Sequence, residues 1–165
     1  MKTIAIIFSL LFSVCAMAQT NALVTRVKDG DTFVARWNGN SYDCRLSNVD
    51  APELKQAYGI TSKDNLSKIL FGKTVTLDSL KKDLYGRVLV NVRVDGMRLD
   101  SLMIRKGWAW HYVIYSRDPM LHLAMQEAAN DRLGLWSCGV AKVCPPWLYR
   151  KYTYRNKLIF CKGCN

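Results

Sequence analysis

The chain has 165 residues, and its 24 lysines and arginines against 13 acidic residues give a formal net charge of +11. That length suits one domain of about 100–150 residues and leaves no room for a second of ordinary size. Surplus positive charge on a small domain favours encounters with polyanions, among which phosphate-bearing molecules are the commonest. A solubility charge or an attraction to membrane surfaces would give the same balance, so charge alone does not identify the partner.

Residues 1–18 have the pattern of a secretory signal peptide. Lys2 supplies a positive start, Ile4–Val14 is a short apolar run, and Ala16–Ala18 offers a small-residue cleavage site. The apolar run is too short for a bilayer of about 30 Å. We therefore expect a mature protein that begins at Gln19, is secreted or periplasmic, and has no stable membrane association. Separately, we expect the protein to be a monomer.

Three short strands are predicted in succession after the signal peptide. The segments Ala22–Val27 and Thr32–Trp37 are rich in Val, Thr and aromatic residues and flank Asp29-Gly30, which is typical of a β-hairpin. A second turn at Asn38-Gly39-Asn40 leads into Ser41–Asn48. Three consecutive strands of this kind predict an antiparallel meander.

The next segments alternate between helical and strand patterns. Predicted helices are Ser62–Leu70, Leu99–Arg105 and Pro119–Arg132, and predicted strands are Thr74–Leu77 and Arg87–Val94. Five short strands with about three helices predict an α+β fold, a five-stranded β-barrel of the oligonucleotide-binding type. We assign this domain to residues 19–137.

Residues 138–165 differ in character and form a basic, cysteine-rich C-terminal extension. It contains a basic and aromatic run, Trp147–Arg155, and four cysteines: Cys138, Cys144, Cys161 and Cys164. Export favours disulfides, although the spacing also allows a zinc site of four thiolates. The pairing stays open, because the last two cysteines can join each other or each reach back to the first two. We expect Cys44 to be the unpaired thiol, since it lies in a strand pattern where a buried cysteine acts as a small hydrophobe.

Acidic residues cluster between Lys28 and Glu53, which is unusual in so basic a chain. Asp31 and Asp50 lie at predicted strand ends, where two carboxylates can bind a hard cation through oxygen while water and a substrate phosphate complete its shell. Glu53 follows three residues after Asp50 and can orient or deprotonate an attacking water. Taken singly, each of these acids is also an ordinary turn or helix-start residue.

Two arginines are candidates to complete this cluster. Arg45 ends the third predicted strand, and Arg87 follows Tyr85-Gly86. A guanidinium can hold two phosphate oxygens at once and can stabilise the charge that grows in a pentacoordinate transition state. Composition does not place the two side by side, and an arginine at a strand end is more often a solvated surface residue.

Five short motifs occur in a fixed order along the chain: Asp-Gly-Asp-Thr, Tyr-Asp-Cys-Arg-Leu, Val-Asp-Ala-Pro-Glu, Tyr-Gly-Arg and Gly-Leu-Trp-Ser. Arg45 lies fourteen residues after Asp31, Asp50 five residues later, and Glu53 three later. This order and spacing resemble the thermonuclease, or staphylococcal nuclease-like, family over about Val24–Ser137.

The resemblance implies a calcium-dependent phosphodiesterase that acts on DNA and RNA and is built on an oligonucleotide-binding barrel. In such an enzyme Asp31 and Asp50 would hold the calcium through their carboxylates. Ala51 would contribute its backbone carbonyl, a contact that does not depend on the side chain. Asp29 would lie near the metal rather than on it.

The resemblance also implies roles for the remaining residues. Arg45 and Arg87 would bind the scissile phosphate, and Glu53 would be the general base. Tyr85 matches a tyrosine that contacts a nucleotide phosphate, and Tyr115 one that lines a base pocket. The leading hypothesis is thus a secreted calcium-dependent nuclease, and its alternative is a non-catalytic nucleic-acid-binding module of the same fold.

Overall fold

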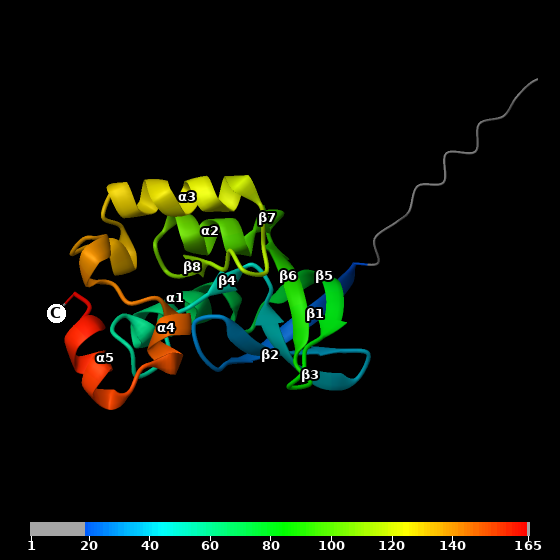
Figure 1. Cartoon of the computed structure of the whole chain (residues 1–165). Coiled ribbons are helices and arrows are strands. Elements are labelled where there is room, and N and C mark those ends of the chain that lie inside the picture. The colour runs from blue at the N-terminus through cyan, green and yellow to red at the C-terminus, as the bar shows by residue number, and fades with distance from the viewer. Residues whose placement is uncertain (1–18, 165) are drawn as a thin grey trace, which may run out of the picture.

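A closed β-barrel forms the centre of the structure, a computed structural model that describes residues 19–164 (Figure 1). Its strands are β1 (Thr20–Val27), β2 (Thr32–Trp37), β3 (Asn40–Leu46), β5 (Thr74–Lys82) and β6 (Val88–Val94). They pair in the order β3-β2-β1-β5-β6, and a parallel pairing of β3 with β6 closes the ring. The five-stranded barrel predicted from the sequence is confirmed. The predicted signal peptide lies outside the described residues.

Three helices accompany the barrel, as the sequence predicted: two pack on its strands, and the third packs on the second helix. They are α1 (Gly59–Leu70), α2 (Leu99–Arg105) and α3 (Pro119–Asn130). Figure 1 shows α2 and α3 side by side on one side of the molecule. The short strands are β4 (Val49–Asp50), which pairs with β8 (Trp110–His111), and β7 (Met97–Arg98), which pairs with β6.

The barrel interior is filled by the alternate residues of its strands. The four valines at positions 88, 90, 92 and 94 of β6 are all buried, and so are Phe33 of β2 and Leu66 of α1. Burying one such side chain contributes about 1.5–3 kcal/mol relative to leaving it exposed. Cys44 is buried among them and is unpaired, as expected, and burial raises the pKa of its thiol to about 12.

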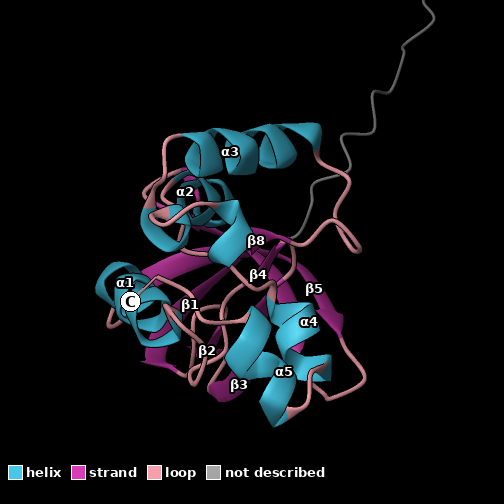
Figure 2. Ribbon diagram, turned by 60° about the vertical axis from the view of Figure 1, so that its left-hand side comes forward, coloured by secondary structure: helices cyan, strands magenta, loops and turns pink. Residues whose placement is uncertain are grey.

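The C-terminal extension folds back onto the barrel domain as two short helices that the sequence did not predict. They are α4 (Pro146–Lys151) and α5 (Tyr154–Phe160), preceded by the 3-10 turns Gly134–Trp136 and Val140–Lys142. In Figure 2 they lie away from the α2–α3 pair, with β4 and β8 between. No helix of residues 19–164 is long and apolar enough to cross a bilayer.

Two disulfides tie this extension together. Cys138 is bonded to Cys164, and Cys144 to Cys161. The last two cysteines therefore reach back to the first two. All four cysteines of the extension are thus paired in disulfides, as the sequence favoured, which leaves none of them as a thiolate for the zinc alternative.

Candidate active site

A tight turn between β1 and β2 sets the position of Asp31. The Asp29 carboxylate accepts hydrogen bonds from the backbone amides of Asp31 at 3.0 Å and Thr32 at 2.7 Å. Gly30 lies so close to the following segment that an added Cβ would be 2.6 Å from the Cβ of Ala51. Only glycine allows this approach, which brings Asp31 next to the segment that carries Ala51. Burial, together with the nearby Asp31 charge, raises the pKa of Asp29 to about 6.

Arg45 lies between two buried carboxylates. The β2–β3 register pairs Thr32 with Arg45, which places Arg45 beside Asp31, and β4 ends at Asp50. The Arg45 Nη2 donates to Asp31 Oδ2 at 3.3 Å and to Asp50 Oδ1 at 3.1 Å. Its Nη1 donates to the Leu46 carbonyl at 2.7 Å. Asp50 is fully buried, at 0% exposed, and the other two charged residues are nearly so.

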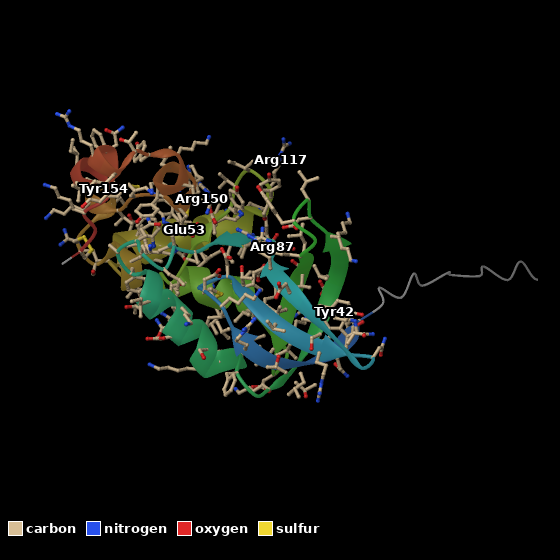
Figure 3. All side chains as sticks on the ribbon, turned by 90° about the horizontal axis from the view of Figure 1, so that it is seen from below. Tyr42, Glu53, Arg87, Arg117, Arg150 and Tyr154 are labelled. Carbon is tan, nitrogen blue, oxygen red and sulfur yellow. A yellow bond between two sulfur atoms is a disulfide. The ribbon has the colours of Figure 1, made fainter. Side chains whose placement is uncertain are left out.

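A second arginine, from the extension, lies on the other side of Asp50. The Arg150 Nη2 donates to Asp50 Oδ2 at 2.8 Å, and its Nη1 donates to Asp50 Oδ1 at 3.2 Å and to Glu53 Oε1 at 2.8 Å. Figure 3 shows Glu53 and Arg150 lying together. Arg150 was not predicted, because it lies about 100 residues from its partners. The only sequence feature that pointed to Arg150 was the basic and aromatic run Trp147–Arg155, which contains it.

The donor atoms at this site suit a hard divalent cation. Asp31 and Asp50 both contact the Nη2 atom of Arg45, so two buried carboxylate oxygens already point toward one positively charged group, the guanidinium. The Ala51 amide donates to Asp31 Oδ2 at 2.9 Å, which holds the Ala51 backbone beside that carboxylate. Burial raises the pKa of Asp50, and the hydrogen bonds from Arg150 offset part of the rise. A positive charge beside Asp50 is therefore favourable.

Arg87 reaches the same face of the barrel but not the acidic cluster. The parallel register pairs Arg45 with Leu89, so Arg87, two residues before Leu89, points to the same side of the sheet as Arg45. Its Nε and Nη2 each lie 2.8 Å from Asp83 Oδ2, within its own loop. Burial opposes the charge of Asp83, but the bonds from Arg87 outweigh it and lower the pKa of this carboxyl. Arg87 therefore faces the same side of the sheet as Arg45 while its side chain is bonded to Asp83, and its place in the acidic cluster stays a prediction.

A tyrosine ring lies over the guanidinium of Arg45 and is itself in contact with two further aromatic rings. The guanidinium lies 5.5 Å from the centre of the Tyr112 ring, which stacks on Trp147 of α4 at 6.1 Å and contacts Tyr115 edge-on at 4.8 Å. Tyr115 is 75% exposed and Tyr85, on the Arg87 loop, is 85% exposed. Both predicted substrate residues are free to meet a nucleotide, and their roles stay predictions.

Comparison of the sequence with known proteins identifies its relatives. Residues 43–138 match the family described as Staphylococcal nuclease homologue. An uncharacterized endonuclease of Escherichia coli is 42% identical over 134 residues, which is 81% of this chain and 86% of that protein. A micrococcal nuclease of Shigella flexneri is 31% identical over 162 residues, 92% of each chain.

An uncharacterized endonuclease of Haemophilus influenzae is 36% identical over 83% of this chain and 77% of its own length. The family match includes Arg45, Asp50, Glu53 and Arg87 but ends before Arg150. Because the match spans more than half of the chain and these relatives align over most of their lengths, the protein belongs to the staphylococcal nuclease-like family.

Proposed function

We propose that the protein is a secreted, calcium-dependent endonuclease that hydrolyses phosphodiester bonds of DNA and RNA with little sequence preference. The observation that carries this proposal is Arg45 held between the buried carboxylates of Asp31 and Asp50, in a barrel of a nuclease family. A formal net charge of +11 supports attraction to a nucleic-acid backbone. Nucleases of this family are generally metal-dependent, and calcium is the specific choice proposed here.

The calcium would be held by Asp31, Asp50 and the carbonyl of Ala51. When bound, it supplies positive charge that neutralises the diester and its developing extra charge. The described residues offer no third carboxylate, imidazole or thiolate gathered at this point. Water and the substrate phosphate would fill the remaining coordination positions.

Three side chains would act on the substrate. Glu53 accepts the proton of the attacking water, and its side chain is 42% exposed, so water can reach it. Arg45 and Arg87 bind the phosphate oxygens and stabilise the charge that grows on them. The Nε and Nη2 atoms of Arg87 are both bonded to Asp83 Oδ2. Arg87 must therefore release Asp83, or bind the phosphate and Asp83 at the same time.

Tyr85 and Tyr115 would contact the nucleotide beside the scissile bond. Their exposed rings can stack on any base, since every base has an aromatic face, and this fits low sequence preference. Two disulfides in the extension support an oxidising compartment, and the predicted signal peptide supports export. A monomer is part of the proposal. Extracellular calcium is abundant, so a weak cation site suffices there.

The first test is hydrolysis with and without the ion. Mature protein from residue 19 onward should degrade both single-stranded DNA and RNA in calcium, and chelation should stop the reaction. Gel electrophoresis of both substrates over time measures this. Full activity in chelator would contradict the metal mechanism, and a folded protein that is inactive in calcium would favour the binding-module alternative.

The second test separates catalysis from binding. Arg87→Ala and Glu53→Ala should each lower turnover by about 100-fold or more, because each removes a group used in the transition state, and should change affinity far less. Steady-state rates and fluorescence anisotropy with a non-cleavable oligonucleotide report the two quantities. Lys142→Ala, an exposed change on the extension, is the control. Proportional losses of rate and affinity would instead indicate a non-catalytic binding module.

A further inference from the structure

We propose that Arg150 of the C-terminal extension is a positioning residue of the nuclease site, which holds Glu53 in place and competes with the bound cation for Asp50. The inference rests on the function proposed above. It concerns a residue outside the matched family region, which ends at residue 138.

The contacts of Arg150 join the two acids whose proposed roles differ. Its guanidinium meets both oxygens of Asp50 and one oxygen of Glu53. Asp50 Oδ1 is shared with Arg45, whereas Asp50 Oδ2 is held by Arg150. A cation bound through Asp50 Oδ2 must therefore displace or share Arg150.

Arg150 is held at this place by more than its own ion pairs. The Glu53 amide donates to Gln56 Oε1 at 3.2 Å, and Gln56 Nε2 donates in turn to the Cys144 carbonyl. The Tyr149 hydroxyl donates to the Lys55 carbonyl at 3.1 Å. The extension thus contacts the turn that carries Glu53 at two points: through Cys144 before α4 and through Tyr149 within α4.

The aromatic contacts of α4 fix the helix against the site as well. Trp147 packs edge-on against Trp110 of β8 at 5.3 Å and stacks on Tyr112 at 6.1 Å. Tyr112 is the ring that faces Arg45. The Cys144–Cys161 disulfide ties the start of α4 to the end of α5. The helix that carries Arg150 is therefore held in place by a disulfide and by aromatic packing.

This placement gives Arg150 two effects of opposite sign. It orients Glu53, which has to meet a water in one geometry, so its loss should slow turnover. It also places a positive charge against a predicted cation ligand, so its loss should strengthen cation binding. A residue with only a structural role would weaken both properties together.

The test compares Arg150→Gln with Lys142→Gln, which removes the same charge from an exposed position of the extension. In isothermal titration of calcium without substrate, Arg150→Gln should bind about tenfold more tightly, an effect limited by the partial exposure of this arginine. Its kcat should fall about tenfold while KM changes less than threefold. Arg150→Lys should recover part of the kcat, and Lys142→Gln should match the wild type in every measurement.

A double-variant cycle checks that Arg150 acts through Glu53. In a Glu53→Gln background, Arg150→Gln should lower kcat by less than threefold, because the group that it orients is already absent. Circular dichroism and thermal melting in chelator confirm that each variant is folded.

Several outcomes would overturn the proposal. An unchanged or weaker calcium affinity in Arg150→Gln would do so, and so would a kcat within twofold of wild type. A raised kcat would mean that Arg150 blocks the site. Equal effects in Lys142→Gln would show that the effect is not specific to Arg150. Wild-type protein that binds calcium without cleaving nucleic acid would refute the proposed function alone, and the affinity comparison would still decide the cation part. Wild-type protein that binds no calcium would refute both.

Discussion

Asp50 is held from two sides, by the barrel and by the extension, and the two sides differ in kind. Arg45 comes from β3 and lies in the buried interior of the site, with its side chain 10% exposed. Arg150 comes from α4, and its side chain is 41% exposed. On the barrel side, Arg45 supplies the positive charge that the buried carboxylates need. We expect a change of Arg150 to cost the fold less than a change of Arg45, because Arg150 is partly exposed and Arg45 still pairs with Asp50 when Arg150 is absent.

The largest effect should follow from removing the barrel side. Arg45→Gln leaves Asp31 with only neutral donors while it remains buried, so the free energy of unfolding should fall by about 3 kcal/mol or more. Activity should fall about 1,000-fold, because a proposed phosphate ligand is lost as well. Urea unfolding in chelator and initial rates on single-stranded DNA measure the two effects.

The matched change on the extension side sharpens the contrast. Arg150→Gln should lower the free energy of unfolding less than Arg45→Gln does, because Arg150 is 41% exposed and the buried Asp50 keeps Arg45 as its counter-charge. Equal losses of stability in the two variants would show that the barrel and the extension hold Asp50 in the same way.

An intermediate effect should follow from loosening the whole extension. The double change Cys144→Ser with Cys161→Ser removes one cross-link, which should cost about 3 kcal/mol of stability. Turnover should fall up to tenfold, because α4 stays attached through Trp147 and Tyr149 but is less well held. Steady-state rates measure this, with thiol titration confirming the remaining disulfide. A variant that keeps full turnover would show that Arg150 does not need this tether.

The smallest effect should come from the loop that holds Arg87. Asp83→Asn removes the partner of Arg87 and should change kcat/KM by about two- to fivefold, since the pair is only partly buried and lies within one loop. Because the folded-state pKa of Asp83 is lowered, the contribution of the pair is present above the ordinary aspartate pKa and is lost as pH falls below it. NMR titration of the Asp83 carboxyl and rates for Asp83→Asn, with Asp64→Asn on α1 as the control, measure these effects. A pKa at or above the ordinary value would contradict the pairing.

The sequence predicted the parts of the site that depend on local pattern. Alternating valines and turn residues indicated the strands, and the register of β2 on β3 follows from the short turn between them, so Arg45 beside Asp31 could be expected. The extension could not be placed in this way. Its position depends on which cysteines pair and on aromatic contacts between α4 and β8, and neither has a local sequence signal. Arg87 was predicted for its motif, but its bond to Asp83 is a loop contact that no strand pattern indicates.

Cys44 affects how the chain can be oxidised. Within residues 19–164 there are five cysteines, and a thiolate rather than a thiol attacks a disulfide. Because burial raises the pKa of Cys44 to about 12, its sulfur stays a thiol at neutral pH. Once the barrel has closed, Cys44 no longer takes part in thiol exchange, and four cysteines are left with only three possible pairings. A barrel that closes before the extension is oxidised would thus keep Cys44 out of the disulfides of the extension.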